Sequence, residues 1–417
     1  MKKFLLIGFV LIVILKVAFL FFVYSQDKER FFFPDSLTYT RPADQILSHH
    51  RFYQHDKPEI FRTPGYPLFI AFSMLFSDNY ELILLFMQII LILILSFYIY
   101  KKRKLLAIGC LTSIILLLEP RIIVSEFSVL SETLYLFFIN IGLFLIIEAT
   151  KKKTNKRLFI GVILLSLATY IRPVAIFLVP ILVVILFLIN KVDLKKAGML
   201  FLIHIIILSF WMGRNKVVSD QFIFSSVGGK NLYYYTAAAV LARAENRPYN
   251  IVKLEFEKNM LGFSSKEKIK YEKKEAFKIL ISNPGSTLFV LGKGLMVNIF
   301  SPGSELFPQL LGMRKGGSGL VYKFNNLSLL QFFKYLLKEE RVLLIAVLPG
   351  FLWNIVLLMF FIKNIIKYRK DSIIILGTVF YLYHIVLTAG PAATSRFTAP
   401  VVPVMLVIAF YKSRNLG

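Results

Sequence analysis

Residues 4–24 read FLLIGFVLIVILKVAFLFFVY, a run of 21 residues in which Lys16 is the only charged one. A helix of this length covers the ~30 Å hydrocarbon core of a bilayer, because it rises about 1.5 Å per residue. No small-residue cleavage signal follows the run, so we expect a retained membrane span rather than a signal peptide. This stretch sets the class of the protein, and the rest of the sequence agrees with it.

The composition excludes several classes of protein. The 417-residue chain is 57% hydrophobic and has a mean hydropathy of +0.68, whereas soluble domains are about 45–50% apolar. A water-soluble enzyme, a disordered chain and a disulfide scaffold are therefore excluded, and the one cysteine, Cys110, has no partner for an internal disulfide. In a membrane protein the net charge of +26 reports topology and contact with anionic lipid. We predict membrane lipids as contacts and no nucleic acid.

Ten apolar runs bounded by charge predict an all-α integral membrane protein with about ten transmembrane helices. The runs are residues 4–24, 79–100, 105–118, 128–147, 158–171, 174–190, 197–213, 342–362, 372–388 and 398–411. We interpret the chain, 1–417, as a single membrane domain with two long outer loops, 25–78 and 214–341. In the second loop, Lys253 to Ile281 predicts a helix that is either solvated or on the outer membrane surface. The run Leu288 to Phe300, interrupted by Lys293, is too short to span and is predicted to be interfacial.

The distribution of Lys and Arg predicts the orientation. With the N-terminus in the cytoplasm, 20 Lys and Arg fall in the short inner segments and only 3 in the short outer connections. The large loop 214–341 holds 20 further Lys and Arg, but long loops cross regardless of charge. We therefore expect a multi-pass protein of the cell (inner or plasma) membrane, with both termini in the cytoplasm.

Ionisable residues gather near the predicted outer ends of the spans. The run 158–171 is too short to cross the hydrocarbon core and ends at Arg172, so Arg172 is expected below the outer surface. Other such residues are Glu132, Arg214, His384 and Arg396. An isolated arginine can snorkel to lipid phosphates, Glu132 can serve as a helix contact, and Lys16 is expected to be structural. Together these residues suggest a charged cavity on the outer face that suits an anionic lipid headgroup.

The first outer loop is the densest in chemical groups. Asp35 follows FFFP, and burial against such a wall would raise its pKa and make it a better base, while a nearby arginine would oppose that shift. Asp44, Asp56 and Glu59 are expected in more polar surroundings. The turn R-T-P-G-Y-P at 62–67 is rigid, and it would hold the Arg62 guanidinium for bidentate contact with phosphate. The histidines of this loop, at 49, 50 and 55, match no strong metal spacing.

A series of motifs resembles the GT-C membrane glycosyltransferases of the protein-mannosyltransferase and aminoarabinose-transferase type. The resemblance begins with Asp35, Tyr39 and the R-T-P-G-Y-P turn. It continues in the family's order over nearly the whole chain, through S-E-T-L-Y (131–135), I-R-P (171–173), W-x2-R-N (211–215), G-G-K-N-L (228–232), S-N-P (282–284) and S-R-F-x2-P-x2-P (395–403).

The resemblance implies a GT-C fold with juxtamembrane helices on the outer face, and an active site on that face. Such enzymes transfer a sugar from a polyprenyl-phosphate donor, such as undecaprenyl phosphate, to a hydroxyl with inversion. It implies that Asp35 acts as general base, that Arg62 contacts the donor phosphate and that Glu132 lines the cavity. We add Arg172, Arg214 and Arg396 as phosphate contacts, and Tyr39, Tyr66 and His384 as cavity residues. The acceptor is a glycan, lipid or protein hydroxyl of the cell envelope.

One departure from the family concerns a metal ion. Aminoarabinose transferases carry an E-K-P-P-like segment whose acid supplies a metal ligand, and Phe61 replaces that acid here. A divalent metal is therefore in doubt, and no cofactor is assigned.

Two other functions fit a multispan protein with a large outer loop. One is an envelope polysaccharide polymerase or ligase that acts on a diphosphate-linked oligosaccharide. The other is a transporter or flippase, which favours charges near the midplane and inverted repeats. A catalytically inactive scaffold is a further alternative. The sequence lacks G-x-G-x-x-G, the GK[ST] P-loop and D-x-D, which favours a lipid-linked donor over a nucleotide sugar.

Overall fold

The computed structural model describes residues 2–54, 56–106, 108–152, 154–313, 327 and 329–412. Within this part of the chain, the secondary structure is helical apart from one short antiparallel hairpin, β1 (Tyr53–Gln54) and β2 (Lys57–Pro58). The predicted all-α membrane class is confirmed.

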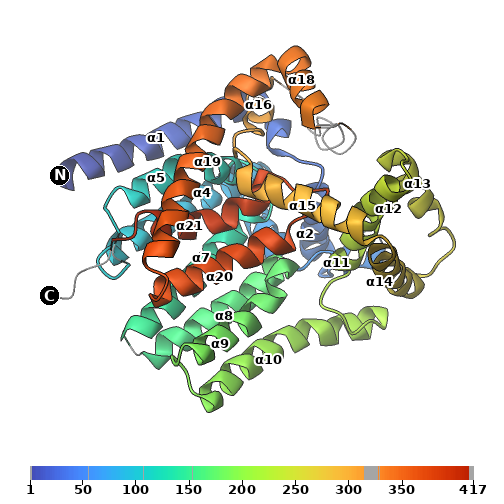
Figure 1. Ribbon diagram of the computed structural model, residues 1–417, viewed down its shortest axis with the longest axis horizontal. Helices are drawn as coiled ribbons and strands as arrows, with labels where there is room; N and C mark the ends of the chain where they lie inside the picture. Colours follow the sequence, from blue (N-terminus) through green and yellow to red (C-terminus); the bar gives the residue numbers. More distant parts are fainter. Residues whose placement is uncertain are drawn as a thin grey trace.

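Among the described residues, five helices are long and apolar enough to cross a membrane: α1 (Lys2–Gln26), α4 (Tyr80–Lys102), α7 (Glu132–Lys152), α10 (Leu194–Ser219) and α19 (Arg341–Lys367). Helix α7 lies at the centre of the bundle (Figure 1), where 72% of its most apolar window is buried. The corresponding share is 22% in α1 and 17% in α10, which lie at the periphery.

Other predicted spans form shorter apolar helical segments. These are α8 (Asn155–Ile171), η2 with α9 (Pro173–Phe177 and Leu178–Leu188), α20 (Ser372–Leu387), and η4 with α21 (Ser395–Val401 and Val402–Ala409). A helix of about 16 residues covers roughly 24 Å, less than the ~30 Å hydrocarbon core. A straight segment of this length placed across the core would leave the turn at one of its ends below the surface.

The prediction of one helix over 105–118 is wrong. Only α5 (Thr112–Leu118) is helical there, and α6 (Pro120–Glu126) follows after a break at Glu119. Pro120 has no N–H to continue a helix, whereas it fits the first position of a new one. The extended Glu119 caps that new helix by accepting the Ile122 N–H at 3.2 Å.

The two long loops contain helices of their own. The first holds η1 (Lys28–Phe31), α2 (Leu37–His49) and the apolar α3 (Gly65–Met74), which we did not predict. The predicted helix over 253–281 is two helices, α13 (Tyr249–Lys258) and α14 (Ser265–Ser282), separated at Gly262 with φ of 83°. The remaining elements are α11 (Val227–Lys230), the π-helix η3 (Asn231–Ala237), α12 (Ala238–Ala244), α15 (Pro284–Phe300), α16 (Phe307–Leu310) and α18 (Leu329–Glu339).

The segment from α11 to α14 builds a small core separate from the main one. Its buried residues include Tyr233, Val252, Phe256 and Ala276, and the rings of Tyr233 and Phe256 stack at 4.4 Å. This part lies at the end of the molecule opposite both termini (Figure 1). It therefore lies at one end of the helix bundle, and its location on the outer side of the membrane stays a prediction.

Basic segments that we predicted on one side of the membrane meet at the end that bears the termini. Buried Glu148 accepts Lys102 Nζ at 2.9 Å and lies 3.2 Å from Arg157 Nη1, and Lys151 pairs with Asp371 at 2.9 Å. These contacts join the ends of α4, α7, α8 and α20. Their common location agrees with the predicted topology, although the side of the membrane stays a prediction.

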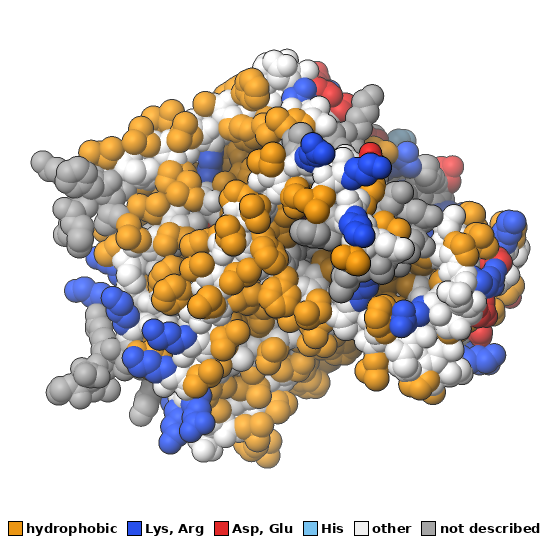
Figure 2. Space-filling model, turned by 45° about the horizontal axis from the view of Figure 1, so that its top comes forward, with side chains coloured by type: hydrophobic (Ala, Val, Ile, Leu, Met, Phe, Trp, Pro, Cys, Tyr) orange, Lys and Arg blue, Asp and Glu red, His pale blue; other side chains and the backbone are white. Residues whose placement is uncertain are grey.

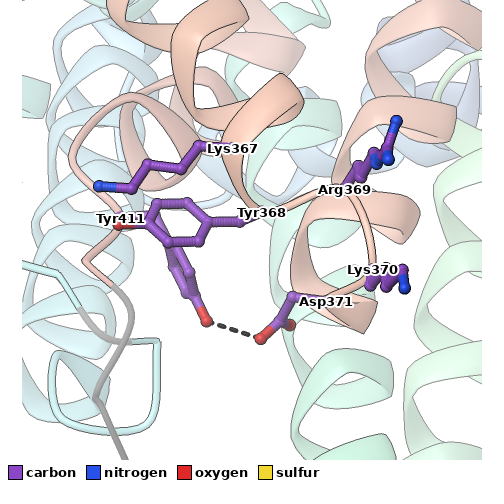
Figure 3. A pocket seen from close by; sticks show the side chains of 6 residues that line it. All are labelled: Lys367, Tyr368, Arg369, Lys370, Asp371 and Tyr411. Carbon is purple, nitrogen blue, oxygen red and sulfur yellow. Dashed lines mark hydrogen bonds between the residues drawn. The ribbon is translucent and has the colours of Figure 1, made fainter.

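A surface hollow of about 360 Å³ lies at this end, lined by Lys367, Tyr368, Arg369, Lys370, Asp371 and Tyr411 (Figure 3). The Tyr411 hydroxyl donates to Asp371 at 2.6 Å. Lys367 points to the opposite side from Arg369 and Lys370, so these cations do not converge on one point (Figure 3). We interpret the hollow as part of the charged surface and not as a binding site.

The lateral surface is apolar. Large side chains are exposed along peripheral helices, such as Ile14 at 56%, Leu202 at 57% and Phe210 at 75%. Figure 2 shows that hydrophobic side chains cover the broad middle of one face, whereas Lys and Arg gather toward its edges. Such a large apolar surface suits contact with lipid rather than water.

Helices α7 and α8 cross at two glycines. A Cβ on Gly142 would lie 3.0 Å from the Gly161 carbonyl oxygen, and a Cβ on Gly161 would lie 2.8 Å from the Gly142 carbonyl oxygen. Small residues at a crossing let two backbones approach closely in a membrane protein. Because α7 begins at Glu132 and α8 ends next to Arg172, this crossing also sets how far apart those two residues lie.

We predict that Gly161→Ala lowers the melting temperature, because the new methyl group meets the backbone of α7 at less than 3 Å. The matched control is Gly198→Ala in α10, where a Cβ meets nothing within 4 Å and alanine favours the helix. Thermal unfolding in detergent measures both. Equal melting temperatures of wild type and Gly161→Ala would contradict the close crossing.

Candidate functional site

Asp35 lies in the turn between η1 and α2, held by buried groups around it. Phe31 and Phe33 are 0% and 7% exposed. The Ser36 hydroxyl accepts the Phe33 N–H at 2.9 Å and donates to the Val129 carbonyl at 2.8 Å. The backbone is thereby fixed, while the Asp35 side chain stays 39% exposed. The FFFP wall that we noted in the sequence therefore anchors the turn and leaves the carboxylate accessible.

Arg62 lies before α3, in a turn braced by Glu59. The Glu59 carboxylate accepts the backbone N–H groups of Phe61 at 2.5 Å and of Arg62 at 2.9 Å. Gly65 lets the chain pass against α8, because a Cβ there would lie 2.8 Å from the Tyr170 carbonyl oxygen. The turn is rigid, as its prolines and glycine predict.

Every nitrogen of the Arg62 guanidinium has a hydrogen-bond partner. Nε donates to Thr38 Oγ1 at 2.8 Å, Nη1 to the Tyr39 hydroxyl at 2.9 Å, and Nη2 to Asp35 Oδ1 at 3.0 Å. The guanidinium also lies over the Tyr39 ring at 4.3 Å. This geometry fixes the orientation of the guanidinium relative to Asp35.

Two further arginines extend this pair into a row of alternating charges. Arg396 Nη2, from η4, donates to Asp35 Oδ2 at 2.5 Å, and its Nε lies 3.7 Å from Glu132 Oε1. Arg172 Nη1, at the end of α8, lies 2.7 Å from the same Glu132 oxygen. The order is Arg62, Asp35, Arg396, Glu132, Arg172. We call these five residues the charged row, and they contribute three positive and two negative charges.

The charged row keeps the Asp35 carboxylate ionised. Burial opposes ionisation of Asp35, but the guanidinium groups of Arg396 and Arg62 outweigh it and hold the pKa of that carboxyl below its usual value. Of the two opposing effects that we expected, the arginines prevail. In this state Asp35 is a weak base, because both carboxylate oxygens are engaged.

Two predicted cavity residues lie behind the charged row and do not face solvent. Tyr66 is 0% exposed, donates to Gln88 at 3.3 Å and packs edge-on against Tyr39 at 5.2 Å. His384 is 1% exposed and shares a hydrogen bond of 2.8 Å with the Tyr135 hydroxyl. Tyr66 therefore supports Tyr39, and His384 supports Tyr135.

Arg214 is not part of the charged row. Its guanidinium donates to the carbonyl oxygens of Phe52 and Glu59, each at 2.7 Å, and it lies over the Trp211 ring at 4.9 Å. It therefore ties the end of α10 to the first long loop, behind the turn that carries Arg62.

Sequence reasoning missed the burial of Glu59, which is 3% exposed although its carboxylate accepts two backbone N–H groups. Burial raises the pKa of Glu59, although the N–H groups of Arg62 and Phe61 oppose that rise. The available signal was an acid just before a turn whose N–H groups need acceptors. Asp44 and Asp56 are exposed, as expected.

The described residues contain no group of three or more His, Cys, Asp or Glu that could hold a metal ion. Asp35 and Glu132, the two carboxylates of the charged row, already have arginine partners. Of the three histidines of the first long loop, the one at position 55 is outside the described residues.

Comparison with known proteins gives one match. Residues 56–212, less than half of the chain, match the family described as dolichyl-phosphate-mannose-protein mannosyltransferase. No curated protein and no solved structure matches the chain. The match supports the GT-C superfamily of membrane glycosyltransferases, and it includes Arg62, Glu132 and Arg172.

The charged row makes the stability of the fold depend on pH in a defined direction. The pKa of Asp35 is lower in the folded protein than its usual value of 3.8, so its contribution is complete above about pH 4 and is lost as the pH falls through the folded pKa. We expect the difference in melting temperature between wild type and Asp35→Asn to shrink over that acidic range. The control is Asp56→Asn, whose side chain is 99% exposed, and it should show no such trend. A difference that does not vary with pH would contradict the pairing.

Proposed function

We propose that the protein transfers a sugar from a polyprenyl-phosphate donor to a hydroxyl acceptor on the outer side of the membrane, with inversion. The observation that carries the proposal is the charged row, which holds one accessible carboxylate between two arginines beside a further Arg–Glu pair. The family match supports a membrane glycosyltransferase, and the donor, acceptor and side of the membrane are our inference.

The excess positive charge is what a departing phosphate requires. Two carboxylates cannot neutralise the charge of three guanidinium groups, so a phosphate that enters the row meets a net positive charge. Guanidinium and phosphate match in geometry, and their charge-assisted hydrogen bonds are roughly twice as strong as neutral ones. The arginines would thus bind the donor and stabilise the charge that develops on its phosphate as the sugar leaves.

Donor binding would also activate Asp35. In the free protein Arg396 and Arg62 engage both oxygens of the carboxylate and weaken it as a base. When these arginines turn to the donor phosphate, Asp35 loses its partners and binds a proton more readily. The base would therefore become effective only when the donor is present.

The chemical step exchanges one bond at the anomeric carbon for another and moves one proton. The acceptor oxygen forms a bond to the anomeric carbon while the bond from that carbon to the phosphate oxygen breaks. The acceptor proton passes to Asp35, and the electron pair of the broken bond stays on the polyprenyl phosphate among the arginines. Attack opposite the leaving phosphate inverts the anomeric centre. Glu132 would keep Arg172 and Arg396 in place through this exchange.

The membrane setting supports a lipid-linked donor. Arg172 and Arg396 of the charged row lie at the ends of short helical segments, where the turns would lie below the bilayer surface. A phosphate headgroup anchored in the outer leaflet reaches such a depth without leaving the lipid. The helices α11 to α15 would cap the row and approach the acceptor side, with α15 at the membrane surface.

We predict that Asp35→Asn abolishes transfer and leaves binding of polyprenyl phosphate intact or stronger, because the near-isosteric amide cannot accept the proton but releases the arginines. The assay offers a panel of polyprenyl-phosphate sugars and envelope acceptors to protein in nanodiscs, and mass spectrometry follows free polyprenyl phosphate. Unchanged turnover would remove Asp35 from the mechanism. Folded wild type that releases no lipid phosphate from any donor would favour the polymerase or transporter alternatives.

Arg62→Ala should weaken donor binding by about tenfold or more, and Arg62→Lys by less, because lysine keeps the charge but loses the fork of donors. The control is Arg214→Lys, whose side chain contacts backbone carbonyls outside the charged row. It should change donor affinity less than Arg62→Ala. Titration with polyprenyl phosphate measures all three variants. Equal affinity of wild type, Arg62→Ala and Arg62→Lys would exclude Arg62 as a phosphate contact.

A further inference from the structure

The backbone that carries Arg396 is held by a carboxylate that sequence reasoning did not single out. The Ser395 N–H, at the first residue of η4, donates to Glu305 Oε1 at 3.1 Å. The first N–H groups of a helix have no partner within the helix and need an outside acceptor. Glu305 supplies it one residue before the side chain that bridges Asp35 and Glu132.

The segment that presents Glu305 is itself tightly held. It is the turn 301–305, S-P-G-S-E, between α15 and α16. Gly303 has φ of 81° and packs on Arg121, since a Cβ there would lie 2.5 Å from Arg121 Cγ. Gly350 of α19 also packs closely on the turn, since a Cβ there would lie 2.6 Å from the carbonyl oxygen of residue 302. The Ser301 hydroxyl donates to the same Glu305 oxygen at 3.2 Å.

The second carboxylate oxygen of Glu305 indicates that this side chain does more than fill space. Oε2 is buried and has no hydrogen-bond partner among the described residues. Burying a polar oxygen without a partner is costly. An apolar side chain would avoid that cost, so the presence of a polar side chain here is explained by the hydrogen bonds that its other oxygen accepts from Ser395 and Ser301.

We propose that Glu305 is a positioning residue that fixes the start of η4 and, through it, the guanidinium of Arg396. The inference rests on the proposed function, in which Arg396 holds the donor phosphate and restrains Asp35. Catalysis is sensitive to placement, and a shift of about 1 Å can cost a hundredfold in rate. Removing the acceptor frees the Ser395 N–H and lets the turn rotate, while the Arg396 side chain itself stays unchanged.

The first test is binding of sugar-free polyprenyl phosphate to protein in nanodiscs. We expect Glu305→Ala to weaken affinity by about tenfold, and Glu305→Gln by less than about threefold, because the amide oxygen still accepts the Ser395 N–H. The matched control is Glu245→Ala, an acidic residue at the surface of the outer helices that pairs with Arg247 at 2.9 Å. It should bind as wild type does.

A double-mutant cycle separates positioning from a general loss of structure. If Glu305 acts through Arg396, Glu305→Ala adds no further loss of affinity when Arg396 is already alanine, because residues of one network are not additive. Additive losses would show an independent effect and would overturn the proposal. Wild-type affinity of Glu305→Ala for polyprenyl phosphate would also overturn the proposal.

Hydrogen exchange gives a readout that does not depend on the proposed function. The amide of Ser395 should exchange faster in Glu305→Ala than in wild type, and Glu305→Gln should restore its protection. If wild type binds no polyprenyl phosphate, the proposed function fails, while this exchange still tests whether Glu305 holds the turn. Unchanged exchange at Ser395 in Glu305→Ala would overturn the positioning role itself.

Discussion

The charged row is the interaction on which the structure of the site depends. Guanidinium groups near the hydrocarbon core of a membrane are stable only with partners, because the low dielectric penalises an isolated charge. Arg62, Arg172 and Arg396 come from segments far apart in the sequence, and each has a carboxylate partner. The two carboxylates are shared among three arginines, so the row is held together and still retains a net positive charge.

The backbone around the row restrains each of these side chains. Glu59 braces the turn before Arg62, and Ser36 anchors the turn of Asp35. The crossing of α7 and α8 at two glycines brings the end that bears Glu132 close to Arg172. Buried partners of this kind make a site rigid, and rigidity is what electrostatic stabilisation of a reacting phosphate requires. The same restraints explain why the arginines bind carboxylates and do not extend to the surface.

Helix length bears on the depth of the row. Segments of 15 to 17 residues, such as α8 and α20, are shorter than the hydrocarbon core, so the polar turns at their ends are expected to lie below a bilayer surface. Longer helices such as α1 and α10 surround them and present apolar side chains outward. Our proposal of a lipid-linked donor rests on this expected depth, which suits a ligand whose anchor remains in the bilayer.

Much of this could be predicted from local patterns in the sequence. Long apolar runs indicated the membrane class and most of the helices, since burial of a span requires an uninterrupted apolar segment. Short runs that end in charged residues indicated a cluster of ionisable residues, and Asp35, Arg62, Glu132, Arg172 and Arg396 do lie in contact with one another. That the cluster is on the outer side of the membrane stays a prediction. The predicted run 105–118 ends at the observed break, but the short helix α6 that follows was missed, although Glu119 as its cap and Pro120 as its first residue are local signals.

The sequence alone determined that the chain lies in a membrane, that ionisable residues gather at the ends of apolar helices, and where the turn rich in proline and glycine lies, because these depend on hydropathy and local backbone geometry. Only the tertiary structure decided which charges pair. It separates Arg214, which holds backbone carbonyls, from the three arginines of the row, and it places Tyr66 and His384 behind the site. It also brings Glu305 to Ser395 across 90 residues. Such pairings depend on how distant helices cross, and no local pattern of residues contains that information.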